Sequence, residues 1–176
     1  EFNPKNWDDN RILKLDGEAY FIVAKGEIFD VKTNSGVVSV IGTQFNVKQR
    51  DNYFEVTCFE GVVKVASDTI TRNLFAGETY QILNGKFTEG KIIASAPKWR
   101  EHMSDFEAIP FIQVLSELER QYNIKVTVEN IDNNRLFTGT FAHDNLENAL
   151  IAITQPMNMT YELNSSNLVI IHGKKN

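Results

Sequence analysis

Apolar and polar residues alternate in short runs through the first 96 residues, and glycine-containing turns separate the runs. Because successive side chains of a strand point to opposite faces, such runs predict strands. In 37–48, VVSVIGTQFNVK, both faces are apolar up to Ile41, whereas after Gly42 only Phe45 and Val47 remain apolar. The pattern predicts a strand that bends at Gly42 and Thr43. The full set of predicted strands is 19–23, 29–33, 37–41, 44–48, 53–59, 62–66, 69–73 and 78–83.

A short phrase recurs in this half, in LDGEAYF (15–21), FEGVVKV (59–65) and FAGETYQ (75–81). Each copy has an apolar residue, one spacer, a glycine and then a new strand. Glycine at such a point permits a positive φ. Many short strands with recurring corners predict either a β-solenoid-like stack or a strongly bent sandwich.

The second half contains a duplication with an offset of 35 residues, in which 106–129 overlies 141–164. In both copies apolar residues recur with the spacing of one helix face. The matched pairs are Phe111 with Leu146, Val114 with Ala149, Leu115 with Leu150, Leu118 with Ile153 and Tyr122 with Met157. An alternating strand pattern follows each helix, after Asn123 and Asn158, and 167–171 adds a final strand.

These patterns predict an α+β protein. Residues 1–96 form an all-β subdomain, 97–105 a linker, and 106–176 a small α/β subdomain made of a repeated βαβ unit. Asp144 and Glu147 have the spacing of a capping box for the second helix.

Composition is that of a folded domain, with 42% hydrophobic and 23% charged residues. The net charge is −5 and both halves are mildly acidic, which disfavours nucleic-acid binding. No run reaches the roughly 18 apolar residues of a membrane span. The chain starts without an initiator Met, so we expect it to be a portion of a longer protein.

Residues able to carry chemistry are few and scattered. His102, His143 and His172 lack the spacing of metal ligands, and Cys58 alternates in phase with apolar strand residues, which predicts a core position. We therefore predict no catalytic residue, no metal and no cofactor, and favour recognition of another protein.

Two alternatives remain open. One is a carbohydrate- or small-molecule-binding β module that uses exposed aromatic residues, for which the candidates are Trp7, Trp99, Tyr53 and Tyr80. The other is a hydrolase in which histidines and carboxylates converge.

Several motifs, in order, resemble the periplasmic domain of FecR-type anti-sigma factors: LDGEAYFIVAK, VIGTQFNV, FEGVVKV and FAGE. The downstream block with PFIQVLSELERQYNIKV and FTGTF resembles the C-terminal domain of that family, which is related to the STN (secretin and TonB N-terminal) module with its repeated βαβ. The resemblance covers about residues 10–172. An earlier strand segment, the inner-membrane helix and the cytoplasmic segment of the family do not occur in this sequence.

The resemblance implies the periplasmic sensor part of a single-pass inner-membrane anti-sigma factor. Its partners would be the signalling domain of a TonB-dependent outer-membrane transporter and, through the cytoplasmic segment, an extracytoplasmic-function sigma factor. We expect the transporter domain to dock by adding a strand to an edge formed by MTYEL (159–163) and LVII (168–171). The expected contacts are Tyr161, Leu168 and Ile170, although strand alternation is also compatible with core positions for them.

Overall fold

The computed structural model describes residues 11–68, 70–132, 135–164 and 167–173. Just over half of these residues lie in strands. The chain divides into two compact units, Glu1–Pro97 and Lys98–Asn176. No helix among the described residues is long and apolar enough to cross a lipid bilayer.

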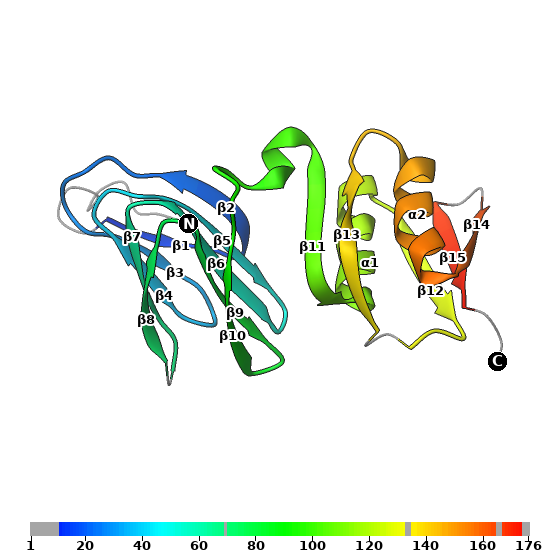
Figure 1. The fold of residues 1–176 in the computed structure, drawn as a ribbon, viewed down its shortest axis with the longest axis horizontal. Coiled ribbons are helices and arrows are strands. Elements are labelled where there is room, and N and C mark those ends of the chain that lie inside the picture. Colours follow the sequence, from blue (N-terminus) through cyan, green and yellow to red (C-terminus); the bar gives the residue numbers. More distant parts are fainter. Residues whose placement is uncertain (1–10, 69, 133–134, 165–166, 174–176) are drawn as a thin grey trace. The chain divides into compact units, whose positions relative to one another are not determined.

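The first unit consists of two five-stranded sheets (Figure 1). One has the order β1-β3-β4-β7-β8, with β1 (Arg11–Lys14), β3 (Phe29–Lys32), β4 (Val37–Val40), β7 (Val62–Ala66) and β8 (Thr71–Phe75). The other has the order β10-β9-β6-β5-β2, with β2 (Gly17–Ile22), β5 (Gln44–Arg50), β6 (Tyr53–Glu60), β9 (Glu78–Leu83) and β10 (Lys86–Lys91). Neighbouring strands are antiparallel except β1 and β3, which are parallel.

The inward residues of both sheets form one hydrophobic core, because alternate positions along each strand are apolar. Val38 and Val40 enter it from β4, and Phe45 and Val47 from β5, all at most 2% exposed. The Phe21 ring stacks on Phe45 with centroids 5.0 Å apart. Tyr80 is fully buried, and its hydroxyl lies 2.7 Å from Ser67 Oγ.

Gly42 and Thr43 form the predicted bend, since β4 belongs to one sheet and β5 to the other. A Cβ on Gly42 would lie 2.9 Å from Lys25 Cα, so only glycine fits here without a shift. Thr43 exchanges backbone hydrogen bonds with Val23, and its hydroxyl donates to the Val62 carbonyl at 3.1 Å. The change of pattern along 37–48 therefore marks a corner of the sandwich.

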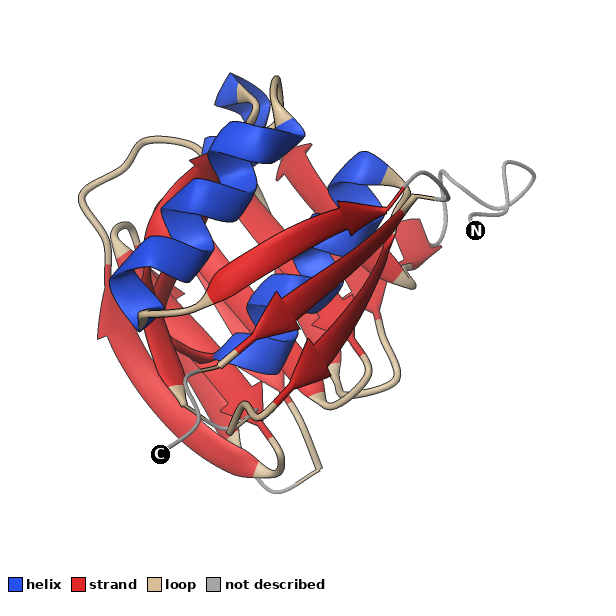
Figure 2. Cartoon of the chain, turned by 90° about the vertical axis from the view of Figure 1, so that its right-hand side faces the viewer, coloured by secondary structure: helices blue, strands red, loops and turns tan. Residues whose placement is uncertain are grey.

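The second unit has two helices between two small sheets (Figures 1 and 2). Strands β11 (Met103–Pro110) and β13 (Leu136–Ala142) form an antiparallel pair. The other sheet has the order β12-β15-β14, with β12 (Lys125–Glu129), β14 (Thr160–Asn164) and β15 (Leu168–His172). Helix α1 (Phe111–Tyr122) contacts β11 and β12, and α2 (Leu146–Thr154) contacts β13 and β14. Short 3-10 turns occupy Lys98–Glu101 and Gln155–Met157.

The predicted fold class is wrong, because the chain is mostly β with several sheets and lacks a repeated βαβ subdomain. The strands on either side of α1 lie in different sheets: β11 pairs with β13, and β12 pairs with β15. A βαβ unit requires both strands in one sheet. Apolar periodicity along the chain is the same in both arrangements, so it could not distinguish them.

Local features of the two helices follow the sequence more closely. The buried face of α1 includes Phe111, Val114 and Leu118, as its spacing predicted. Asn123 and Asn158 have φ values of 51° and 55°, the left-handed conformation that ends each helical segment. The cap of α2 differs from prediction: the side chain of Asn145, not Asp144, accepts a hydrogen bond from Asn148 N at 2.9 Å.

Candidate functional site

The three-stranded sheet β12-β15-β14 has one face against the helices and one open face. β15 is the central strand, parallel to β12 and antiparallel to β14. Val169 and Ile171 are at most 1% exposed and form the inner face. The neighbours in register with them, and therefore on the same face, are Val126, Val128, Leu163 and Tyr161.

The other face carries Leu168, Ile170 and His172 along β15, and we call it the open face. Figure 2 turns this face toward the viewer. The flanking residues are all exposed: Lys125, Thr127 and Glu129 on β12, and Thr160, Glu162 and Asn164 on β14. An apolar centre within a polar rim is the usual anatomy of a protein interface.

His172 links the strands of this sheet. Its Nδ1 lies 3.2 Å from Glu129 Oε2 on β12, and its Nε2 lies 3.7 Å from Glu162 Oε1 on β14. A protonated imidazole would pair with both carboxylates, whereas a neutral one can donate to only one of them. The side chains of both glutamates are more than half exposed, so solvent weakens either ion pair.

The structure places the three predicted contact residues on two faces. Leu168 and Ile170 are half-buried on the open face of the central strand. Tyr161 is paired with Ile171 and therefore lies on the inner face, at the outer strand β14. In the sheet order β12 and β14 are the outer strands, so 168–171 does not form the edge itself. The group formed by Glu129, Glu162 and His172 was not predicted, because only strand pairing brings these residues together.

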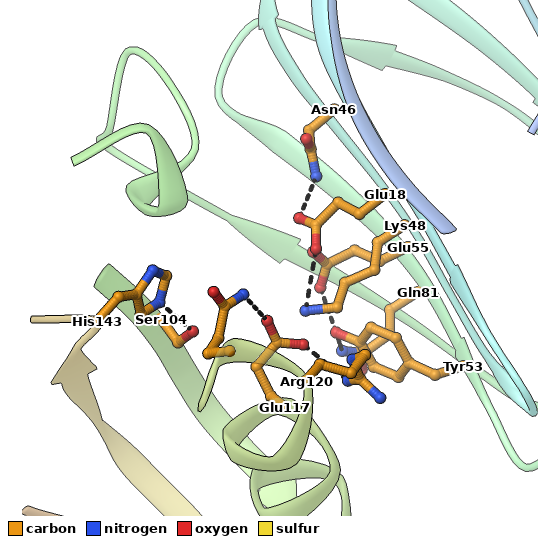
Figure 3. A network of polar contacts seen from close by, with 11 residues as sticks. Glu18, Asn46, Lys48, Tyr53, Glu55, Gln81, Ser104, Glu117, Arg120 and His143 are labelled. Atoms are coloured by element: carbon orange, nitrogen blue, oxygen red, sulfur yellow. Dashed lines mark hydrogen bonds and ion pairs between the residues drawn. The ribbon is translucent and has the colours of Figure 1, made fainter. Parts of the chain in front are cut away.

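A row of polar side chains crosses the second sheet of the first unit (Figure 3). Glu18 accepts a hydrogen bond from Asn46 Nδ2 at 2.9 Å and lies 3.4 Å from Lys48 Nζ. Strand register continues the row through Lys48 to Glu55 and then to Gln81. Burial raises the pKa of the Glu55 carboxyl despite hydrogen bonding to Tyr53 and the nearby charge of Lys48.

The Tyr53 hydroxyl joins this row from the same strand as Glu55. It donates to Glu55 Oε2 at 2.5 Å and accepts from Gln81 Nε2 at 2.8 Å. Burial, followed by the Glu55 charge, raises the pKa of Tyr53. The row is therefore a hydrogen-bonded network in which burial favours the proton-bearing forms of Glu55 and Tyr53.

A serine and a histidine meet in the second unit, as Figure 3 also shows. Ser104 Oγ on β11 lies 2.9 Å from His143 Nε2, and burial lowers the pKa of His143. A hydrolase needs an accessible nucleophile and a carboxylate that orients the imidazole. Ser104 is only 7% exposed, and the carboxylate of Glu117 accepts hydrogen bonds from Arg120 and Gln121. We therefore interpret the pair as a link between β11 and the residue after β13.

The remaining residues considered for chemistry are the possible metal ligands and Cys58. Within the described ranges, no three or more His, Cys, Asp or Glu side chains gather as a metal site would require. Cys58 is fully buried, as predicted, and burial raises its thiol pKa to about 11.

Of the four aromatic residues considered for ligand binding, two are buried. Tyr80 is in the core and Tyr53 is 7% exposed and hydrogen-bonded. Trp99 is 37% exposed on the first 3-10 turn, and Trp7 lies outside the described residues. The described positions therefore give no particular support to an aromatic sugar-binding surface.

Comparison with known proteins gives matches in both units. Residues 2–64 match the family described as "FecR protein", and residues 105–171 match "FecR, C-terminal". No curated protein matches the chain significantly. Among solved structures, a crystal structure at 1.65 Å of a "putative anti-sigma factor" from Parabacteroides distasonis is 26% identical and has a TM-score of 0.85. A second crystal structure of that description, at 2.50 Å, is also 26% identical and has a TM-score of 0.86. Each alignment covers 95% of this chain and 82% of the other.

The two family matches occur in the order that their descriptions imply, and together they span about three quarters of the sequence. The two structural matches cover residues of both units, and their sequence identity to this chain is 26%. The chain therefore belongs to the FecR family.

Proposed function

We propose that this chain is the periplasmic, signal-receiving part of a membrane-anchored anti-sigma factor. In this proposal a TonB-dependent outer-membrane transporter delivers the signal, and the rest of the protein controls an extracytoplasmic-function sigma factor. The observation that carries the proposal is the tandem of FecR and FecR C-terminal regions, together with the likeness over 95% of this chain to a protein described as a "putative anti-sigma factor".

The sheet β12-β15-β14 is the proposed docking site for the transporter's signalling domain. β14 is an outer strand of this sheet, and its backbone can accept a further strand by β-augmentation. A strand added there would run beside Tyr161 and beside Leu163, which is 49% exposed. A partner that also overlies the open face would cover Leu168 and Ile170, the other two predicted contacts.

The test is a binding titration between this chain and purified signalling domains of transporters encoded beside it. Lysine at Leu163 or Ile170 would place a charge in the proposed interface, so we expect each substitution to weaken binding at least about tenfold, or 1.4 kcal/mol. Thr140→Lys is the matched control, because it places the same charge at an exposed position of β13, in the other sheet of the same unit. Circular dichroism must show that all variants keep the wild-type melting temperature.

Two results would reject the proposal at different levels. Equal affinity of Leu163→Lys, Ile170→Lys and wild type would reject this docking site while leaving the signalling role intact. Failure of every neighbouring transporter domain to bind the folded wild-type chain would reject the transporter as the source of the signal.

A further inference from the structure

The outer strand β14 lacks the features that commonly prevent an edge from pairing again. It pairs with β15 from Thr160 to Asn164 without a register shift, and it ends the sheet on that side. Outer strands in natural proteins often carry lysine, proline or a bulge that blocks a further strand. The sequence of β14, TYELN, has neither lysine nor proline, whereas the opposite outer strand, β12, begins with Lys125.

The inner side of β14 is incompletely covered. Leu163 is in register with Val169, which is 1% exposed, yet Leu163 itself is 49% exposed. Tyr161 is half-buried, although its partner Ile171 is fully buried. A strand added beside β14 would bring one side chain next to each of these two residues, and apolar side chains there would complete the inner layer.

Glu162 lies between these two residues and faces the opposite way, on the open face. Its side chain is 74% exposed, and its carboxylate is 3.7 Å from His172 Nε2, which is beyond hydrogen-bond distance. Thr160 and Asn164, on the same face of β14, are exposed and uncharged. Glu162 is therefore the one charged residue among the five residues that β14 presents to an adjoining strand.

We propose that Glu162 determines the specificity of this edge, and that it selects a strand with lysine or arginine directly opposite it. This inference rests on the proposed docking at β14. Opposite charges that face each other on neighbouring strands attract, and like charges repel. Because side chains alternate along a strand, the residues on either side of that cation face Tyr161 and Leu163 and are apolar. The partner segment thus has the pattern apolar, basic, apolar.

The same carboxylate disfavours a second copy of this chain as the added strand. Glu162 is the central residue of β14. Two β14 strands that pair antiparallel about their centres would place the two Glu162 side chains directly opposite each other, which is destabilising. Each copy also carries a net charge of −5, which adds repulsion.

The probes are two fluorescein-labelled peptides of seven residues in which threonine and valine surround one central charged residue. The central residue is lysine in one peptide and glutamate in the other, with valine on either side of it. Fluorescence anisotropy should show that the wild-type chain binds the lysine peptide about fivefold more tightly, the scale of one cross-strand charge pair. Glu162→Gln should abolish this preference, and Glu162→Lys should reverse it.

Glu107→Lys is the matched control, because it makes the same change of charge at an exposed position of β11, in the other sheet of the same unit. It should leave the preference for the lysine peptide in place. Circular dichroism must show that the variants keep the wild-type melting temperature. Leu163→Lys should weaken binding of both peptides, since it places a charge beside their apolar residues.

Several results would overturn the proposal: equal binding of both peptides to the wild-type chain, no binding of either, or a preference that Glu162→Lys leaves unchanged. A dimer, measured by light scattering, that Leu163→Lys dissociates would do so too, because a second copy would then be the occupant. The outcome is separable from that of the proposed function. A transporter domain whose binding is weakened by Leu163→Lys but not by Glu162→Lys would reject the role of Glu162 and keep the docking site. A peptide preference without binding of any transporter domain would keep the specificity of the edge and reject the transporter.

Discussion

The hydroxyl of Tyr53 donates a 2.5 Å hydrogen bond to the carboxylate of Glu55, two residues further along β6. Both side chains lie on the same face of the strand, in the polar row that begins at Glu18. Burial raises the pKa of Glu55, and this relationship makes the stability of the chain depend on pH.

A glutamate with a raised folded-state pKa binds more protons in the folded than in the unfolded chain over the interval between the two pKa values. The free energy of unfolding therefore falls as pH rises through that interval, which begins near the ordinary carboxyl value of about 4.3. We expect Glu55→Gln, which keeps an acceptor for Tyr53, to raise the melting temperature at pH 7.5 relative to wild type. The gain should shrink as pH approaches 4.5.

Glu107→Gln, at an exposed position of β11, is the control for the loss of one negative charge. Thermal unfolding followed by circular dichroism at several pH values provides the comparison. A Glu55→Gln gain that stays constant with pH would contradict the assigned role of Glu55.

The contribution of His143 to the free energy of unfolding should change with pH in the direction opposite to that of Glu55. Burial is the main cause that lowers its pKa, the charge of His102 acts in the same direction, and Glu117 opposes both. Below the ordinary imidazole pKa of about 6.5, the unfolded chain then binds more protons than the folded one, so stability falls as pH falls through this interval. The proton NMR titration of the His143 ring should have a lower midpoint in the folded chain than in urea. Equal midpoints would refute the prediction.

Asn145 should contribute measurably to the stability of α2. Its side chain accepts a hydrogen bond from Asn148 N at 2.9 Å, which satisfies one of the free donors at the helix start. Asn145→Ala should lower the free energy of unfolding by about 1 kcal/mol. Urea denaturation followed by far-ultraviolet circular dichroism measures the change. Asp144→Ala, one residue earlier, should stay within about 0.5 kcal/mol of wild type, and the reverse ranking would restore Asp144 as the cap.

Cys58 should be unreactive in the folded chain. The side chain is fully buried and burial raises the thiol pKa to about 11, so little thiolate is present at pH 8. A thiol reagent such as DTNB should label the chain slowly under native conditions and rapidly in urea. Rapid labelling without denaturant would show that this part of the core opens readily.

The periodic patterns of apolar residues along the chain predicted most of the local structure. The alternation in 37–48 located the bend at Gly42, and the i, i+3, i+4, i+7 spacing located both helices. These features depend on residues close together in the sequence, whose side chains choose a face according to a fixed period. The family resemblance likewise rested on contiguous motifs. The two family matches bear out its FecR part, whereas the predicted relation to the STN module is not shown.

Those patterns could not predict which strands pair with one another. A strand, a helix and a strand in succession look alike whether the two strands share a sheet or, as with β11 and β12, belong to different sheets. Backbone hydrogen bonds to distant residues decide between these arrangements, and they also place β15 between β12 and β14. The open face and its His172 pairs therefore arise only from tertiary structure, because each combines residues from three strands.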